Sequence, residues 1–523
     1  MYPVGIDLGT SNSVISVYRK GKTEVLSVDG YNLVPSVVAF RDANTMLVGG
    51  QAKRMAEMYP ETTVVEVKRL MGDRKHRYNI HGKSFSPVDI SSFIVKKLIE
   101  GGEKTLGCKI EEVVITVPAY FTEDQKEDTK SAGRAAGVKV LRLLPEPTAA
   151  AIAYGFGKGR DQTLLVYDLG GGTFDVSLLK VEGDNFEVVA VNGNHDLGGR
   201  NFDAAIMSFA LDAFKKDTGI DLQKLKDKGG SDEALKALQV LKEASEKAKI
   251  ELTESQETGI DCPNLFEGKH LSVDLTRNQF ERMIEGHILK TRDLVRKTLG
   301  EARMDVDDID RVILVGGSTK IPLVKQVISE SVKDPFIAEN VDEIVSTGAS
   351  LVAASLGAPS EEVVGLPEEA EAQDRLRDLK FQNVTAHSLG AKVQDEKQNP
   401  FFQPMIVKNT KVPCEGFFIG STAGGGQSMV RVEAFRGEDR DCSKNQRLGD
   451  CLLTGIKISK DPVPVAIWFK LDEDGILHVR GATINFTNPY RVMEYIKKNK
   501  LNELQEGSDF RVEKEVSTTI DAS

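Results

Sequence analysis

The sequence predicts an α/β region built from two related halves, followed by a separate all-β domain. Residues 1–357 alternate apolar runs with amphipathic helical stretches, which is typical of α/β architecture. Within this region one strand-and-glycine motif occurs twice. From residue 384 to about residue 488, short alternating segments separated by glycine- and aspartate-rich turns indicate a β-sandwich. A chain of 523 residues is long enough to form all of these units.

The repeated motif reads VGIDLGT at residues 4–10 and VYDLGGGT at residues 166–173. In each copy an apolar strand is followed by aspartate, leucine, a glycine turn and threonine. Apolar alternation resumes at Val14–Val17 and at Val176–Leu179, so each copy predicts a strand–turn–strand hairpin. A P-loop would continue as a helix instead. A third apolar strand, 312–315, runs into the turn 316–322 and then into a helix.

Two facing glycine turns suit a di- or triphosphate, because their backbone N–H groups can approach an anion closely. The hydroxyls of Thr10 and Thr173 add donors, whereas Asp7, Asp168 and Asp175 can only accept and would repel phosphate. We therefore expect hydrated Mg²⁺ between the acids and the phosphates. One copy of the motif would be an ordinary hairpin turn, but two copies followed by the same threonine favour a phosphate clamp.

Two charged residues outside the repeat are further candidates. Lys68 could reach a terminal phosphate or the water that attacks it, although a single lysine is more often solvated surface. Glu146 precedes Pro147, which favours extended backbone and could direct the carboxylate away from the following helix. An ordinary loop acid is the alternative for Glu146.

A long helix is predicted over residues 233–253. Its apolar side consists of Leu235, Leu238, Leu241, Ala248 and Leu252. Glu246, Lys249 and Thr253 share one flank, where they could hydrogen-bond a ribose and adenine. A solvent-exposed Glu–Lys pair would explain the same spacing. The double-glycine turn at 316–317 offers another contact to a nucleoside or anion.

Composition excludes several classes of function. With 68 basic and 79 acidic residues the net charge is −11, which disfavours nucleic acid and anionic membranes as partners. The longest uncharged run, residues 344–358, is too short for a membrane span and predicts a buried helix. The five cysteines include no CxxC pair, which predicts reduced thiols. The sequence has no HExxH motif, so we expect no protein-built zinc site. It has no leader-like segment, and together with the reduced thiols this predicts a cytoplasmic location.

The segment between the two predicted regions is acidic. Residues 359–378 contain seven acids and few large apolar side chains, so we predict an acidic linker over 358–383. After the sandwich, residues 489–523 are expected to form a short tail, with at most one helix around 492–504.

These motifs together resemble those of the heat-shock seventy chaperones of the DnaK type. Beside the two hairpins, the resemblance rests on segments that occur in the family's order, namely Ile115–Phe121, Glu146–Ala151, Leu197–Asp203, Gly316–Pro322 and Asp474–Val479. It extends across nearly the whole chain. The resemblance implies an actin-like (ribonuclease H-like), two-lobed ATPase followed by a peptide-binding β-sandwich, acting in protein folding and the stress response.

The resemblance also implies roles for individual residues. Phosphates and Mg²⁺ would be held by Asp7, Gly9, Thr10, Ser11, Asp168, Gly170, Gly171, Gly172, Thr173, Gly198 and Gly199, with Asp7 and Asp168 reaching the metal through water. Lys68 would position the attacking water, and Asp175 and Glu146 would organise water and K⁺. The adenosine of ATP or ADP would contact Glu246, Lys249, Thr253, Gly316, Gly317, Ser318, Lys320 and Asp342. Pro118 would relay the nucleotide state, Arg142 would face a J-domain partner, and Ala423, Val430 and Val432 would line the peptide cleft.

The chain departs from the family pattern at several points. Lys320 replaces an arginine that stacks on adenine, which predicts weaker nucleotide binding. The apolar inter-domain linker is replaced by Leu379–Asn383, and a large apolar residue of the cleft by Gly420. Extra residues fall around 394–399. Because only 35 residues follow Asn488, we expect no helical lid and therefore fast exchange of bound peptide.

The favoured hypothesis is an ATP-dependent chaperone that binds and releases extended apolar segments under the control of slow hydrolysis. A J-domain co-chaperone and a nucleotide exchange factor are its expected partners. The alternative is a nucleotide-switched scaffold that holds one dedicated protein. A small-metabolite phosphotransferase, the third class considered, leaves the sandwich unexplained.

Overall fold

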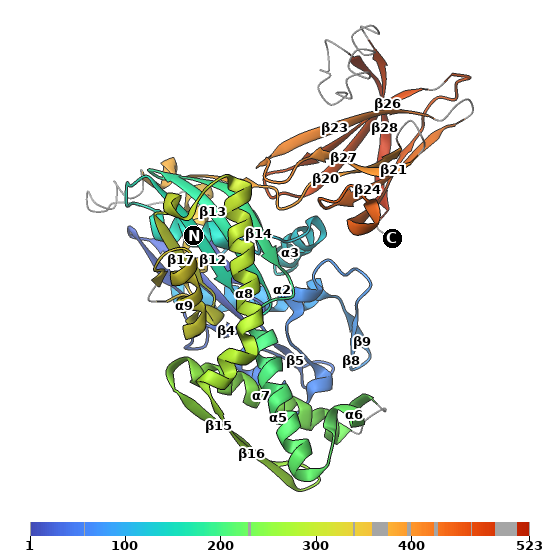
Figure 1. The fold of residues 1–523 in the computed structure, drawn as a ribbon. Helices are drawn as coiled ribbons and strands as arrows, with labels where there is room; N and C mark the ends of the chain where they lie inside the picture. Colours follow the sequence, from blue (N-terminus) through green and yellow to red (C-terminus); the bar gives the residue numbers. More distant parts are fainter. Residues whose placement is uncertain are drawn as a thin grey trace. The chain divides into compact units, whose positions relative to one another are not determined.

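The computed structural model describes residues 2–56, 58–227, 232–337, 340–357, 375–394, 399–422, 427–461, 463–486 and 510–521. The chain divides into two compact units, Met1–Phe381 and Gln382–Ser523 (Figure 1). The division lies close to the predicted start of the sandwich. However, residues 375–381 belong to the first unit, and residues 375–378 are helical, so the linker predicted to continue through residue 383 is too long. A chain segment that packs on the first unit cannot act as a spacer.

The first half of the first unit is built on an antiparallel meander joined to parallel strands. Its sheet runs in the order β3-β2-β1-β10-β11, with β4 (Val34–Pro35) beside β2. The strands are β1 (Val4–Leu8), β2 (Asn12–Arg19), β3 (Lys22–Val25), β10 (Glu112–Val117) and β11 (Lys139–Pro145). Strands β1 to β3 are antiparallel, whereas β10 and β11 are parallel to β1.

The second half repeats this topology in the order β14-β13-β12-β17-β18. Its strands are β12 (Gln162–Leu169), β13 (Phe174–Glu182), β14 (Asn185–Asn194), β17 (Arg311–Val315) and β18 (Phe336–Ile337). The hairpins β1–β2 and β12–β13 are both antiparallel, and β17 runs parallel to β12. The prediction of two related halves, each opening with a strand–turn–strand hairpin, is therefore confirmed.

Two helices join the halves. Helix α4 (Glu146–Gly155) packs on β12 and β13, α10 (Ile344–Leu356) packs on β1 and β2, and the two helices contact each other. Most of α10 is buried, as its uncharged sequence predicts. Helix α2 (Pro87–Leu106) begins at a capping box in which Ser86 and Asp89 satisfy each other's backbone N–H groups. Helix α3 (Glu123–Ala135) begins in the same way at Thr122.

Further helices and strands complete both halves. In the first half these are β5 (Val38–Phe40), β6 (Met46–Val48), α1 (Gly50–Ala56), η1 (Pro60–Thr62), β7 (Thr63–Val64), η2 (Val67–Leu70), β8 (Tyr78–Ile80) and β9 (Lys83–Phe85). In the second they are α5 (Gly199–Thr218), α6 (Leu222–Asp227), α7 (Asp232–Glu254), β15 (Glu257–Phe266), β16 (Lys269–Thr276), α8 (Arg277–Ala302), η3 (Val306–Asp308), η4 (Gly317–Lys320) and α9 (Pro322–Ser331). The ribbon β15–β16 packs on α7 and α5 (Figure 1).

Helix α7 matches the helix predicted over residues 233–253. Four of the five leucine and alanine side chains assigned to its apolar side are buried, but Leu235 is 43% exposed. The assignment of Leu235 to the core is therefore wrong, and this residue lies in the first turn of the helix. No helix within the described ranges is both long and apolar enough to cross a membrane.

The second unit is a β-sandwich whose strands follow the order β21-β20-β24-β25-β28-β27-β26-β23. It consists of β20 (Leu389–Gln394), β21 (Pro400–Ile406), β23 (Cys414–Ser421), β24 (Met429–Arg436), η5 (Cys442–Lys444), β25 (Gln446–Thr454), β26 (Pro464–Leu471), β27 (Leu477–Phe486) and β28 (Phe510–Asp521), with β19 (Lys380–Val384) pairing β22 (Lys411–Val412). Buried side chains from β20, β24 and β25 share one core with Ile467 and Phe469 of β26, so the two ends of the strand path pack face to face.

Strand β28 corrects the predicted end of the sandwich. It pairs antiparallel with both β25 and β27, so residues 510–521 belong to the sandwich and not to a tail after residue 488. The sequence of residues 510–521 is too polar to indicate a strand by itself. The strand depends instead on its pairing with a neighbouring strand on each edge. The helix predicted around 492–504 lies outside the described residues.

Candidate active site

The two glycine turns meet at one cavity of about 300 Å³ within the first unit. Residues from both halves line it, including Asp7, Gly9, Thr10, Ser11, Lys68, Glu146, Asp168, Gly170, Gly171, Thr173, Glu246, Lys249, Thr253, Gly316, Gly317, Ser318, Lys320 and Asp342. The structure therefore brings most of the predicted phosphate, adenosine and acidic residues into a single place. The fold explains why: each turn follows the first strand of its half, and the halves face each other.

The backbone is packed too closely for side chains at two turn positions. A Cβ atom on Gly9 would lie 2.1 Å from the carbonyl oxygen of Asn12, and one on Gly171 would lie 2.6 Å from Oγ of Ser11. Since Ser11 belongs to the first turn and Gly171 to the second, the turns approach each other directly. This is the close backbone approach that an anion site needs.

Gly198 and Gly199 support the second turn and are not among the residues that line the cavity. The N–H of Gly199 donates to the carbonyl of Gly170 at 3.0 Å, and the N–H of Arg200 donates to the carbonyl of Gly171 at 2.8 Å. The hydroxyl of Ser318 also donates to the Gly170 carbonyl, at 3.0 Å. These bonds fix the orientation of the turn.

Buried acids concentrate at the ends of the first strands. Asp7 is the penultimate residue of β1, and burial, reinforced by the charge of Glu146, raises its pKa to about 7. The hydroxyl of Thr116 donates to Asp7 at 2.8 Å, which lowers the pKa without cancelling the shift. Asp168 lies across the β12–β13 ladder from Asp175. Burial and Glu146 raise the pKa of Asp175 to about 8 and hold that of Asp168 well above its ordinary value.

Lys68 opposes these acids from the short helix η2. Its ammonium lies 2.5 Å from Oε1 of Glu146 and 5.5 Å from the centre of the Phe121 ring, and both partners of the ion pair are buried. Lys68 is thus paired with Glu146. Among the described residues that line this end of the cavity, no second cation is available to Asp7, Asp168 and Asp175. Phosphates could not bind beside these acids unless another positive charge came with them.

The donor set fits Mg²⁺. Carboxylate oxygens are the ligands that this ion prefers, and two of them, on Asp7 and Asp168, line the cavity beside the glycine turns. Within the described ranges no group of three or more Asp, Glu, His or Cys side chains is placed to hold a metal directly. The arrangement thus suits an ion that keeps much of its water shell and arrives with the phosphates.

The opposite end of the cavity carries charged pairs. Lys249 lies 2.7 Å from Asp203, Lys320 lies 2.6 Å from Asp342, and Lys53 of the first half lies 3.6 Å from Glu246. Burial raises the pKa of Asp203, although the charge of Lys249 acts in the opposite direction. Because Asp342 holds the Lys320 ammonium, that side chain is anchored at the rim of the cavity.

The remaining predicted residues lie elsewhere. Asp175 and Pro118 are buried and, like Gly172, are not among the cavity-lining residues. The guanidinium of Arg142, on β11, lies 5.6 Å from the ring of Phe381. In the second unit Val430 and Val432 are partly buried on β24 and pack against the sandwich core, whereas Ala423 lies outside the described residues.

Sequence reasoning missed three polar partners: Thr116, Asp203 and Lys53. Thr116 and Asp203 fall inside motifs recognised in the sequence, 115–121 and 197–203, but nothing local identifies Asp7 or Lys249 as their partners. Leu33 and Ile250, which line the cavity, also gave no signal. Ile250 is 58% exposed and could be mistaken for an isolated surface residue.

A duplicated α/β scaffold that closes on a glycine-lined, acid-rich cavity defines the class of two-lobed nucleotide-binding proteins, here followed by a β-sandwich. The chain belongs to the Hsp70 protein family, whose model matches residues 3–81 and 73–517. It is 39% identical to "Chaperone protein DnaK" of Thermotoga neapolitana over 512 residues, covering 96% of this chain and 81% of the relative. The proteins of the same name from Thermotoga petrophila and Thermotoga sp. strain RQ2 match to the same extent.

Membership of this family defines the activity. The protein is an ATPase that binds ATP or ADP with Mg²⁺, and it is an ATP-dependent chaperone. The actin-like ATPase domain and the β-sandwich correspond to the two units of the structure.

Proposed function

We propose that slow ATP hydrolysis at the cavity of the first unit controls the capture and release of extended apolar peptides by the sandwich. The observation that carries this proposal is the convergence of two glycine turns, each preceded by an aspartate, on one cavity that also holds a buried Lys–Glu pair. With no strong general base among the described cavity residues, hydrolysis would depend on positioning and electrostatics, which makes it slow.

The roles within the cavity follow from charge and position. The turns 9–11 and 170–173 hold the phosphates through N–H and hydroxyl donors, with Thr173 donating to the transferred group. Asp7 and Asp168 orient the water shell of Mg²⁺, which neutralises phosphate charge when bound. Lys68, oriented by Glu146, positions the attacking water. Asp175 and Glu146 organise further water and K⁺.

The adenosine is held at the opposite end of the cavity, by Glu246, Lys249, Thr253 and the turn 316–318. The ion pair between Lys320 and Asp342 supports the view that Lys320 does not stack on the base, since its ammonium is held at 2.6 Å by the carboxylate. We therefore expect weaker nucleotide binding than an arginine at this position would give.

The peptide cleft is assigned to Ala423, Val430 and Val432 of the second unit. Val430 and Val432 alternate with exposed residues along β24 and keep part of their surface accessible, which supports contact with an apolar side chain. Gly420 in place of a large apolar residue leaves the cleft wider.

Communication with partners is assigned to Pro118 and Arg142. Arg142 lies over the ring of Phe381, at the end of the first unit, so a J-domain partner that binds Arg142 would compete with this contact. We also propose that a nucleotide exchange factor acts on this protein and that the protein is located in the cytoplasm.

The experiment is a release assay in which a fluorescein-labelled peptide with a central run of leucines is bound to the ADP form and then mixed with ATP. Faster release with ATP than with ADP supports the proposal, and equal release rates with the two nucleotides would contradict it. Indifference to varied apolar peptides, together with tight binding of one folded protein, would instead establish the dedicated scaffold.

A further inference from the structure

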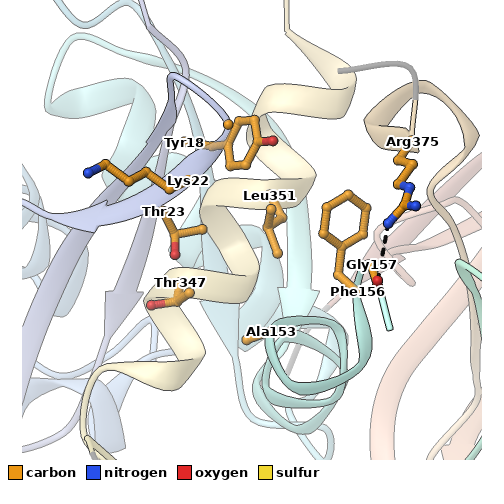
Figure 2. Close-up of a pocket in the computed structure, with 10 residues that line it drawn as sticks. Tyr18, Lys22, Thr23, Ala153, Phe156, Gly157, Thr347, Leu351 and Arg375 are labelled. Carbon is orange, nitrogen blue, oxygen red and sulfur yellow. Dashed lines mark hydrogen bonds between the residues drawn. The ribbon is translucent and has the colours of Figure 1, made fainter. Parts of the chain in front are cut away.

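Arg69 follows Lys68 on the short helix η2, but its side chain does not line the nucleotide cavity. It also does not line the separate cavity of about 430 Å³ between the β2–β3 hairpin and helices α4 and α10 (Figure 2). Its guanidinium instead lies beside the second glycine turn. A Cβ atom built on Gly172 would lie 3.3 Å from Nη1 of Arg69 and 3.8 Å from the methyl carbon of Thr10. Arg69 therefore reaches the second turn close to the point where that turn approaches the first.

Asp196 of the second half holds the other nitrogen of this guanidinium. Nη2 of Arg69 donates to Oδ1 of Asp196 at 2.8 Å. Asp196 belongs to the segment between β14 and α5, and this segment packs tightly on the turn, since a Cβ atom on Gly198 would lie 2.7 Å from the backbone nitrogen of Gly172. The Asp196 side chain is 83% exposed and that of Arg69 only 20%. The ion pair thus adds little stability, because one partner is solvated, but it sets the direction of the guanidinium.

The second terminal nitrogen of Arg69 is buried and unpaired. Nη1 has no hydrogen-bond partner in the part of the chain that the structure describes. The guanidinium stays charged, and its N–H groups can only donate. A buried donor without an acceptor costs free energy, so an unpaired nitrogen beside a binding site calls for an explanation.

The peptide between Gly172 and Thr173 can supply the missing acceptor. Thr173 lines the nucleotide cavity, whereas Gly172 and Arg69 do not, so this peptide separates the cavity from the guanidinium. A trans peptide carries its N–H and its C=O on opposite sides. When the N–H of Thr173 faces a phosphate in the cavity, the carbonyl of Gly172 therefore faces away from the cavity, toward Arg69. Glycine at position 172 lets the peptide adopt this orientation at little steric cost.

We propose that Arg69 is a positioning residue for ATP hydrolysis: its Nη1 donates to the carbonyl of Gly172 and thereby holds the N–H of Thr173 toward the terminal phosphate. Donors that are already oriented toward the transferred group stabilise the transition state without the cost of reorientation. Asp196 occupies Nη2 and leaves Nη1 for the turn. The inference rests on the proposed role of the turn 170–173 in holding phosphate, and it adds a residue that acts on the nucleotide only through that turn.

The first test compares hydrolysis with nucleotide binding in the full chain. Arg69→Met removes both donors and should lower the single-turnover rate of ATP hydrolysis by about 30-fold, with the ADP affinity within about twofold of the unaltered chain. Arg74→Met is the matched control, because Arg74 is an exposed arginine of the same segment and pairs with Asp124. It should change neither quantity.

A conservative variant separates the hydrogen bond from the charge. Arg69→Lys keeps the positive charge, but one ammonium cannot reproduce the two-sided fork that contacts Asp196 and the turn. We expect it to recover no more than about threefold of the lost rate. A normal rate in Arg69→Lys would mean that charge alone suffices, and this would overturn the proposed hydrogen bond.

A second measurement does not depend on turnover. The affinity of the ADP–Mg²⁺ complex for inorganic phosphate is measured by calorimetry, because phosphate is the product that leaves the second turn. Arg69→Met should weaken this affinity by about fivefold or more, and Arg74→Met should leave it unchanged. Losses of ADP affinity and phosphate affinity by the same factor would show a purely structural role and would overturn the inference.

The outcomes also distinguish this inference from the proposed function. If Arg69→Met and Arg74→Met behave alike while the unaltered ADP complex binds phosphate, only the role of Arg69 is wrong. If the unaltered ADP complex binds no phosphate, the assignment of the turn 170–173 as a phosphate clamp is wrong, and the role of Arg69 is overturned with it.

Discussion

The two halves of the first unit share a strand order but carry different charges at corresponding positions. Asp7 of the first half faces Val14 across its hairpin, whereas Asp168 of the second half faces a second acid, Asp175. The first half supplies the Lys68–Glu146 pair. The second half supplies the glycine turn that Arg200 and Ser318 hold in place. The two halves thus share one backbone topology, but each supplies different side chains to the cavity.

The largest effect is expected from removing the cation of the first half. Lys68→Met should lower the single-turnover rate of ATP hydrolysis by about 10³-fold, because the buried acids of the second half would then face the phosphates without it. Nucleotide affinity, measured by calorimetry, should change much less. Lys20→Met, at the exposed hairpin turn, is the control. A Lys68→Met variant that retains the normal rate would remove Lys68 from the mechanism.

Substitutions of the two threonines compare how much each half contributes to hydrolysis. Thr173→Ala should reduce hydrolysis by about 10²-fold with nucleotide binding largely intact, as for other donors that act in the transition state. Thr10→Ala, the equivalent change in the first half, should have a smaller effect if the second turn faces the transferred phosphate. Equal losses in the two variants would show that the halves contribute symmetrically.

Glycine-to-alanine substitutions compare the backbone packing of the two turns. Gly9→Ala should destabilise the protein by about 2 kcal/mol or more, because the new Cβ would lie 2.1 Å from a backbone oxygen. Gly170→Ala should cost less than about 1 kcal/mol, since its Cβ would have no neighbour closer than 3.7 Å. Urea denaturation of both variants checks this order, and a reversed order would contradict the close approach at Gly9.

Per pH unit, the smallest effect is a pH dependence that comes mainly from the second half. Burial raises the pKa of Asp175 to about 8, whereas an unfolded aspartate titrates near 3.9. Between these values the folded state binds more protons than the unfolded state, so stability falls as pH rises. For the protein without nucleotide or Mg²⁺, Asp175 contributes a slope of up to about 1.4 kcal/mol per pH unit.

Asp175→Asn should flatten this slope between pH 5 and pH 8, as measured by urea denaturation at each pH. Asp196→Asn, at an exposed acid, should leave it unchanged. A slope that is identical in Asp175→Asn and the unaltered chain would mean that the carboxyl of Asp175 is already ionised at pH 5.

Much of the fold could be predicted because its signals are local. The hairpin at 166–179 and the helix at 233–253 follow from alternation and from apolar spacing, which depend on neighbouring residues alone. The donation from Thr116 to Asp7 could not be predicted, because β1 and β10 are distant in sequence and become neighbours only in the sheet. Strand β28 was missed for the same reason, since its pairing partners lie in β25 and β27.

The sequence by itself determined the duplicated hairpins, the acids and glycines of the clamp, and the change from α/β to β architecture, because these features depend on short-range periodicity and turn chemistry. Only the tertiary structure decided which charges pair. Lys68 with Glu146, Lys249 with Asp203 and Arg375 with the end of α4 are contacts between segments far apart in the chain. Their geometry exists only in the folded chain, because burial and distance set the strength of a charge interaction.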